Sequence, residues 1–130
     1  MARDKIDVQY PILNHTESIA NVKIETTKIN PKNGITIQNC YMNWNKNTFI
    51  HIINFGETSI LTVKAGNSYP NSMLGDIQIE IPNGINAMNL YDLSRFVTND
   101  YDLNLDFEEK FDGAIYVVAQ WNGVSERKER

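Results

Sequence analysis

The stretch Asp76-Ile77-Gln78-Ile79-Glu80-Ile81 alternates polar and apolar residues without a break. The stretch Leu103-Asn104-Leu105-Asp106-Phe107-Glu108 does the same. Because successive side chains of a β-strand point to opposite faces, this alternation predicts two strands, each with one face in a core and the other in solvent. Half-buried strands of this kind are typical of antiparallel sheets.

Four other runs extend the pattern. Shorter alternations at Lys5–Tyr10 and Asn21–Glu25 predict two more strands of the same kind. The runs Phe49–Ile53 and Ala114–Ala119 are apolar on both faces. They predict either central strands or strands whose second face meets another subunit.

Turn-forming sequences separate these runs, and they lie at Asn30–Gly34, Asn54–Gly56, Ala65–Asn67, Pro82–Gly84 and Asp112–Gly113. Their spacing leaves room for about eight to ten strands. Apolar residues nowhere recur at helical spacing over three turns, and the one short helix expected is Tyr91–Phe96. The fold class predicted is therefore all-β: a single-domain antiparallel β-sandwich with a jelly-roll-like topology.

A chain of 130 residues is long enough for one domain with a proper core. We expect residues 1–10 to form an extended N-terminal arm or an edge strand, residues 11–121 to form the sandwich, and residues 122–130 to form a charged, disordered tail. The stretch Gly66–Gly75 is rich in polar turn formers, so we expect a less ordered loop there.

Charge and composition exclude several classes of protein. The net charge of −4 argues against a sequence-independent grip on nucleic acid or on an anionic membrane surface. No apolar run approaches the roughly 18 residues of a membrane-spanning helix, and the N-terminus lacks the apolar core of a signal peptide. Cys40 is the one cysteine, so it forms no internal disulfide. We expect a protein made in a reducing compartment.

Residues that could support catalysis are few. His51 lies in an apolar run and His15 beside a turn, while Cys40 reads as a small buried hydrophobe. Asp102 and Asp106 share one face of a predicted strand, but alternate strand residues lie about 7 Å apart, too far to hold one calcium ion without a folded loop. We therefore predict no catalytic residue, no metal site and no cofactor, and do not expect an enzyme.

The second half of the chain carries a series of motifs in a fixed order: Thr62-Val63-Lys64-Ala65-Gly66, Pro70, Leu74-Gly75-Asp76-Ile77, Ile81-Pro82-Asn83-Gly84, Leu93-Ser94-Arg95-Phe96-Val97, Leu103-Asn104-Leu105-Asp106-Phe107 and Gly113-Ala114-Ile115. This order resembles the family of small head decoration (cement) proteins of tailed bacteriophages. The resemblance covers Ile60–Ala119, and Ala2–Ile6 resembles the extended start of such proteins. The stretch Asn30–Phe55 departs from the family pattern.

The resemblance implies a virion structural protein, made in the bacterial host cytoplasm. Such a protein decorates the outside of the capsid and stabilises the expanded head by bridging major capsid proteins. Its expected partners are the major capsid protein and further copies of itself, as a homotrimer or homodimer.

Three groups of residues are candidates for this role. We predict that Arg3, Lys5 and Ile6 bind the capsid, and that Arg95 and Phe96 form a structural turn in which Arg95 pairs with Asp92 or Asp106. The predicted oligomer or lattice interface comprises the outward-facing residues of the two-sided apolar runs: Phe49, His51, Ile53, Tyr116 and Val118.

The alternative function is a carbohydrate-binding β-sandwich, on a virion or elsewhere. It would use Tyr41 and Trp44 as an aromatic platform within an Asn-rich stretch. Against it stands the interpretation that Trp44 and Trp121 plug the ends of the sandwich or lie in an oligomer interface.

Overall fold

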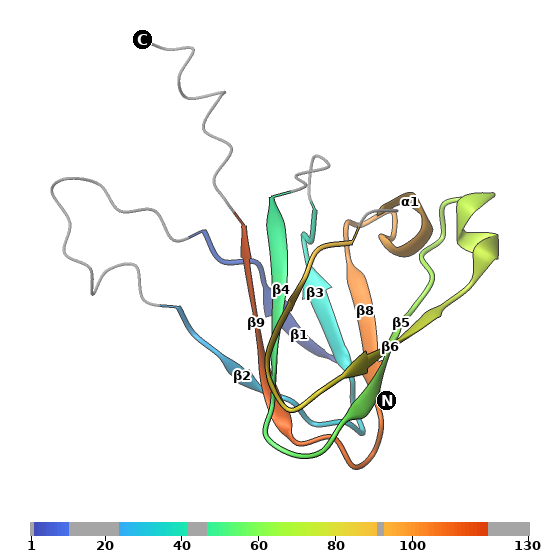
Figure 1. Cartoon of the computed structure of the whole chain (residues 1–130). Helices are drawn as coiled ribbons and strands as arrows, with labels where there is room; N and C mark the ends of the chain where they lie inside the picture. The colour runs from blue at the N-terminus through green and yellow to red at the C-terminus, as the bar shows by residue number, and fades with distance from the viewer. Residues whose placement is uncertain (1, 11–23, 42–46, 91–92, 120–130) are drawn as a thin grey trace, which may run out of the picture.

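The computed structural model describes residues 2–10, 24–41, 47–90 and 93–119 of the chain. Within this part of the chain, nine strands form two sheets that face each other (Figure 1). The strand predicted at Asn21–Glu25 lies partly outside the described residues, and its described end, Ile24–Glu25, is not in a strand. The tail predicted for residues 122–130 lies wholly outside them.

The first sheet has the spatial order β1–β3–β8–β5–β6. Its strands are β1 (Asp4–Asp7), β3 (Ile35–Gln38), β8 (Leu103–Phe107), β5 (Ser59–Val63) and β6 (Ile77–Ile81). The second sheet has the order β2–β9–β4–β7, and its strands are β2 (Thr27–Lys28), β9 (Gly113–Ala119), β4 (Thr48–Asn54) and β7 (Gly84–Met88). Among the described residues, two short helices lie in the connections, the 3₁₀ helix η3 (Asn71–Leu74) before β6 and α1 (Leu93–Phe96) before β8.

The pairing of strands β2 to β9 is that of a jelly roll. β2 pairs with β9, β3 with β8, β4 with β7 and β5 with β6, all antiparallel. These nested pairs describe one long hairpin folded over so that successive pairs alternate between the two sheets. The all-β sandwich predicted from the alternating runs is confirmed.

One pair departs from the antiparallel expectation, because β1 runs parallel to β3 over four residue pairs. No tight hairpin joins the two strands, so the direction of β1 is not imposed by a turn. Within this chain, residues 4–7 thus form an edge strand of the first sheet, which is one of the two alternatives expected for the N-terminus.

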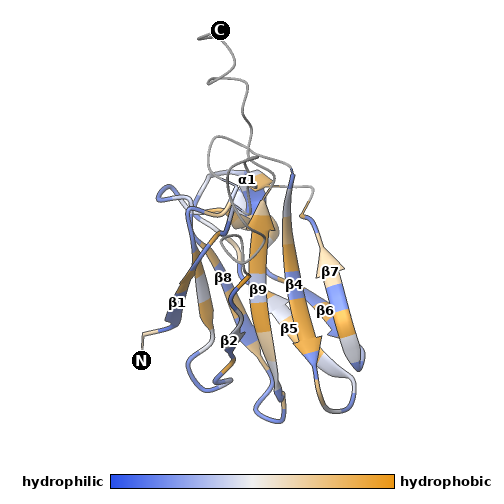
Figure 2. Ribbon diagram, turned by 90° about the vertical axis from the view of Figure 1, so that its left-hand side faces the viewer, coloured by the Kyte–Doolittle hydropathy of each residue, from blue (hydrophilic) through white to orange (hydrophobic). Residues whose placement is uncertain are grey.

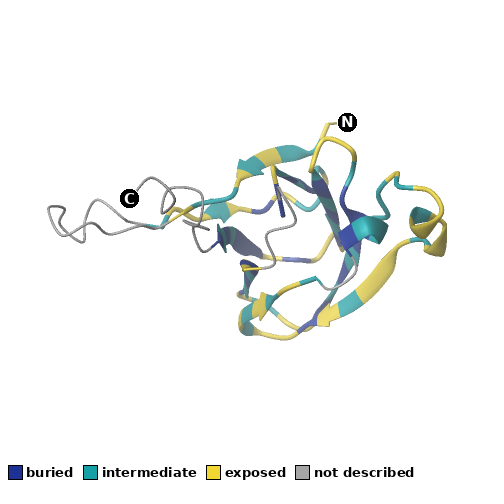
Figure 3. Cartoon of the chain, turned by 90° about the horizontal axis from the view of Figure 1, so that it is seen from above, coloured by how far each residue is buried: buried dark blue, intermediate teal, exposed yellow. Residues whose placement is uncertain are grey.

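The core lies between the sheets, as Figure 3 shows by the dark blue strands that face each other. On β8 the predicted alternation holds, because Leu103 and Leu105 are fully buried while Asn104 and Asp106 are half-exposed. On β6 it holds for the second half of the strand, since exposure falls from 38% at Ile77 to 4% at Ile81. In the described residues, no helix has the length and hydrophobicity to cross a membrane.

The N-terminal segment joins the two sheets at one open side of the sandwich. β1 belongs to the first sheet, but Gln9 lies beside Val118 of β9 in the second sheet. The Gln9 backbone N–H donates to the Val117 carbonyl at 2.9 Å, and the Ala119 N–H donates to the Gln9 carbonyl at 2.9 Å. The segment therefore bridges the edges of both sheets.

Candidate functional site

The solvent-facing side of the second sheet carries an unbroken group of uncharged, mostly apolar side chains. This outer apolar face consists of Phe49, His51, Ile53, Ile85, Ala87, Tyr116 and Val118, from strands β4, β7 and β9. Figure 2 shows that β9 and β4, the two central strands, are hydrophobic along most of their length.

The strand register places these residues side by side. Phe49 lies opposite Val118, and His51 lies between Tyr116 on β9 and Ala87 on β7. Directly opposed residues of paired strands point to the same face. Their neighbours in the sequence point inward and are buried, including Ile50, Ile52, Ile115 and Val117. All five residues predicted as an interface thus lie on one surface.

This face is partly open to solvent. Phe49 is 42% exposed and Ile85 is 72% exposed. The rings of His51 and Tyr116 stack in parallel, with centroids 4.5 Å apart and planes 4° apart. The Nδ1 atom of His51 is shielded from solvent and has no hydrogen-bond partner in the described part of the chain. A shielded polar atom without a hydrogen-bond partner costs free energy in the folded state.

Arg3 and Asp106 form a bidentate ion pair between the N-terminus and β8. Arg3 Nε donates to Asp106 Oδ1 at 3.0 Å, and Nη2 donates to Oδ2 at 3.0 Å. Gly34 leaves space for this pair, since a Cβ on Gly34 would lie 2.8 Å from Asp106 Oδ1. The guanidinium of Arg3 is therefore paired within this chain, whereas the Lys5 side chain is exposed to solvent.

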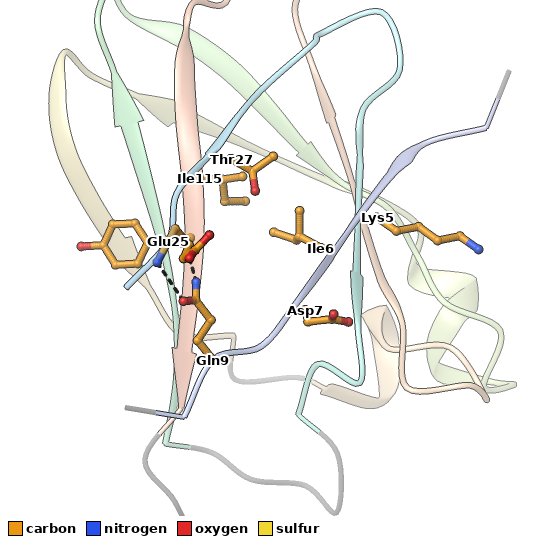
Figure 4. A pocket seen from close by; sticks show the side chains of 8 residues that line it. Lys5, Ile6, Asp7, Gln9, Glu25, Thr27 and Ile115 are labelled. Atoms are coloured by element: carbon orange, nitrogen blue, oxygen red, sulfur yellow. Dashed lines mark hydrogen bonds between the residues drawn. The ribbon is translucent and has the colours of Figure 1, made fainter. Parts of the chain in front are cut away.

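A cleft of about 310 Å³ lies between β1 and β2, where the N-terminal segment crosses the open side of the sandwich (Figure 4). Ile6 and Ile115 project into it, and Lys5 points away from it. Gln9 closes part of it, because its side-chain amide donates to the Glu25 carbonyl at 2.7 Å and accepts from the Glu25 N–H at 2.9 Å. Of the three residues predicted to bind the capsid, Ile6 thus faces this cleft and Lys5 faces solvent.

Arg95 holds a loop of its own chain, but the prediction that it pairs with Asp106 is wrong. Its guanidinium donates to the carbonyls of Gly75 at 2.8 Å, Leu74 at 3.2 Å and Asp76 at 3.2 Å. Asp106 pairs with Arg3 instead, because β8 presents that carboxylate toward the β1 edge of the sheet. Asp92 lies outside the described residues.

Phe96, the other residue of this predicted turn, packs in the core at 4% exposure. The guanidinium carbon of Arg95 lies 4.9 Å from the centre of its ring. Both residues therefore contact their own chain.

Asp76 holds the other side of the same loop. Its carboxylate accepts from Lys64 Nζ at 2.7 Å and from the Ala65 N–H at 2.7 Å. The hydrogen bond from Lys64, then that from Ala65, lowers the pKa of Asp76 from its ordinary value. The stretch expected as a less ordered loop is thus hydrogen-bonded on both sides and contains the 3₁₀ helix η3.

The proposed aromatic platform for a sugar is wrong at Tyr41. This side chain is 1% exposed, and its hydroxyl donates to Asn89 Oδ1 at 3.1 Å and accepts from the Leu90 N–H at 2.8 Å. A ring enclosed by the core presents no face to a ligand. Trp44 lies outside the described residues.

Cys40 is a small buried side chain, as predicted, with no exposed surface. Burial, and then the negative charge of Asp102, raises the pKa of its thiol. A raised pKa disfavours the nucleophilic thiolate. Among the described residues, no three His, Cys, Asp or Glu side chains cluster closely enough to hold a metal ion. His15 lies outside these residues.

A second exposed apolar group, which the alternation of the sequence does not predict, lies on the loop that carries η3. Tyr69 and Met73 are each 74% exposed, and Leu74 is 64% exposed. The available signal was the adjacent pair Met73-Leu74, which interrupts a run of polar turn formers.

Comparisons of this chain with protein-family models, with curated proteins and with solved structures find no match.

Proposed function

We propose that this chain is a non-enzymatic structural protein that decorates the outside of a tailed-phage capsid and stabilises the expanded head. The observation that supports this best is the outer apolar face. An uncharged, mostly apolar sheet surface on an otherwise acidic protein is an aggregation liability unless a partner covers it.

We propose a capsid protein as the partner because the motif order of the second half of the chain resembles that of head decoration proteins. The jelly-roll fold is compatible with this choice by analogy only, because the fold occurs in viral capsid proteins and also in lectins. The role needs a stiff scaffold and contact surfaces rather than reacting groups.

The size of the outer apolar face bears on how it would bind. β4 and β9 span seven residues each and β7 spans five, so the three strands cover at most roughly 23 Å by 14 Å, or about 300 Å². A standard stable interface buries about 800 Å² on each partner. The face alone is therefore too small, and firm attachment to a lattice requires further contacts by the same molecule.

Stabilisation of the head then follows from linkage. A protein that binds the expanded lattice but not the unexpanded one shifts the equilibrium toward the expanded state by mass action. Bridging neighbouring major capsid proteins would oppose internal pressure without any chemical step.

Co-sedimentation of the purified protein with undecorated capsids, before and after expansion, tests the proposal. We expect saturable binding to expanded capsids in a fixed ratio to the capsid protein, and weaker binding before expansion. Absence of binding to both forms would overturn the proposal.

A further inference from the structure

The loop before β6 projects three large apolar side chains from the sandwich. This apolar tip consists of Tyr69, Met73 and Leu74, which are 74%, 74% and 64% exposed. Figure 3 shows η3 mostly in the exposed colour. The surrounding stretch Ala65–Gly75 contains no Asp, Glu, Lys or Arg. The tip is therefore an uncharged contact element on an acidic protein.

The tip is held in place before any partner arrives. The guanidinium of Arg95 donates hydrogen bonds to three successive carbonyls at the C-terminal end of the tip, from Leu74 to Asp76. Asn71 Nδ2 donates to Ser94 Oγ at 2.5 Å and ties η3 to α1. A contact element that is already ordered loses less conformational entropy on binding.

A complementary surface lies on the same chain, at the side of the sandwich between β6 and β7. This β6–β7 cleft has a volume of about 130 Å³. Ile50, Ile52 and Ile81 form its buried floor, and Ile79 and Met88 are half-buried at its sides. Its exposed rim carries Glu80 and Ala87.

The cleft matches one side chain of the tip in size and polarity. An apolar cavity of about 150 Å³ accepts a benzene ring, so a cleft of this size has room for one Met or Leu side chain. Met is unbranched and adapts to irregular gaps, and Met73 is among the most exposed side chains of the tip.

We infer that Met73 of one copy inserts into the β6–β7 cleft of a second copy, with Tyr69 and Leu74 covering its rim. The contact joins two different surfaces, so it is heterologous and builds a closed ring or an open chain of copies. Both surfaces carry little charge, which limits the repulsion between copies that each have a net charge of −4. The contact adjoins the outer apolar face at Ala87, which belongs to both surfaces, and does not depend on what the protein decorates.

A mixed disulfide tests which surfaces meet. A Met73→Cys variant and a Met88→Cys variant are purified separately, mixed and oxidised mildly, and the products are identified by mass spectrometry. We expect a disulfide between residues 73 and 88 of different copies, formed much faster in the mixture than in either variant alone. Cys40 has no exposed surface and does not compete.

Phe55→Cys replaces Met73→Cys in the matched control. Phe55 is 58% exposed and directly follows β4, whose C-terminal end lies away from η3 (Figure 1). Cross-linking of this control to residue 88 as fast as Met73→Cys would show random collision and overturn the inference. No disulfide between residues 73 and 88 would also overturn it.

Sedimentation velocity gives an independent measure. We expect the double variant Met73→Ser/Leu74→Ser to associate at least tenfold more weakly than the wild type, with an unchanged Tm. Unchanged association would assign the contact to another surface, such as the outer apolar face. Capsid binding is read in a separate experiment, so failure here and failure of the decoration role are distinguishable.

Discussion

Arg3 is a residue whose charge suggests one role and whose contacts suggest another. A cation near the N-terminus suits an acidic capsid surface, yet Arg3 forms a bidentate pair with Asp106 at 2.9–3.0 Å. The two side chains are 30% and 41% exposed, so solvent screens the pair in part. Arg3 therefore anchors β1 against β8.

A double-mutant cycle on Arg3→Ala and Asp106→Ala tests this anchor. We expect a coupling free energy of about 1 kcal/mol in urea unfolding, near the upper end for partly exposed pairs, because the geometry is bidentate. If the two single effects simply add, the pair does not stabilise the fold. If Arg3→Ala loses capsid binding while Asp106→Ala keeps it, Arg3 contacts the capsid directly.

Asp76 makes part of the stability depend on pH. Its pKa is lowered in the folded protein, below the ordinary value of 3.8, so its ionised form stabilises the fold. That contribution is present above the unfolded pKa and disappears as the pH falls through the folded pKa. Because the side chain is 37% exposed, we expect Asp76→Asn to lower the free energy of unfolding at pH 7 by at most about 1 kcal/mol.

Urea unfolding of the wild type and of Asp76→Asn at pH 7 and pH 3 checks this dependence. The difference between the two proteins should shrink markedly at pH 3. Asp7→Asn is the matched control, because the Asp7 side chain is exposed and makes no hydrogen bond or ion pair within the described residues. An equal difference at both pH values would contradict the assignment.

At the scale of elements, α1 and the loop that contains η3 form one unit through Arg95. Its three carbonyl acceptors require a planar guanidinium with several donors. We expect Arg95→Ala to lower the free energy of unfolding by about 1–3 kcal/mol, since hydrogen bonds to charged groups contribute in this range.

Arg95→Lys keeps the charge but loses the forked donor, so we expect it to recover only part of the Tm lost in Arg95→Ala. Thermal unfolding of the two variants measures this difference. An unchanged Tm in both would show that the loop is held by its other contacts.

The elements differ in how far the sequence predicts them. β6 and β8 follow from alternation, which is a local property. The two-residue β2, the parallel direction of β1 and the order in the η3 loop depend on partners far along the chain. Arg95 bonds carbonyls about twenty residues away, and Arg3 pairs with a residue 103 positions away. Periodicity carries no information on such contacts.

The same dependence on distant contacts explains which predicted site residues are exposed in the structure and which are not. Phe49, His51 and Tyr116 were found because a run that is apolar on both faces must leave one face outside the core. Tyr41 was misplaced, because exposure of a single aromatic near a turn depends on packing that no local pattern reports. Its side chain is 1% exposed, and its hydroxyl accepts a hydrogen bond from the N–H of Leu90, a residue 49 positions away.

For the whole molecule, the proposed role requires the outer apolar face to affect attachment to a lattice and not folding. A substitution of Phe49 can distinguish an effect on attachment from an effect on folding. The Phe49 side chain is 42% exposed, while its strand neighbours Thr48 and Ile50 are buried. Truncating it removes apolar surface from a contact but leaves the core filled. We expect Phe49→Ser to weaken binding to expanded capsids at least tenfold, with a Tm within a few degrees of the wild type.

Tyr101→Ser is the matched control for this variant. Tyr101 is an aromatic residue of similar exposure, 37%, and it precedes β8 of the first sheet, away from the outer apolar face. Its truncation should leave capsid binding unchanged, so a selective loss in Phe49→Ser assigns attachment to the second sheet. If both variants bind like the wild type, attachment uses another surface. If both lose binding in proportion to their Tm, the effect arises from folding, and the outer apolar face has no direct part in attachment.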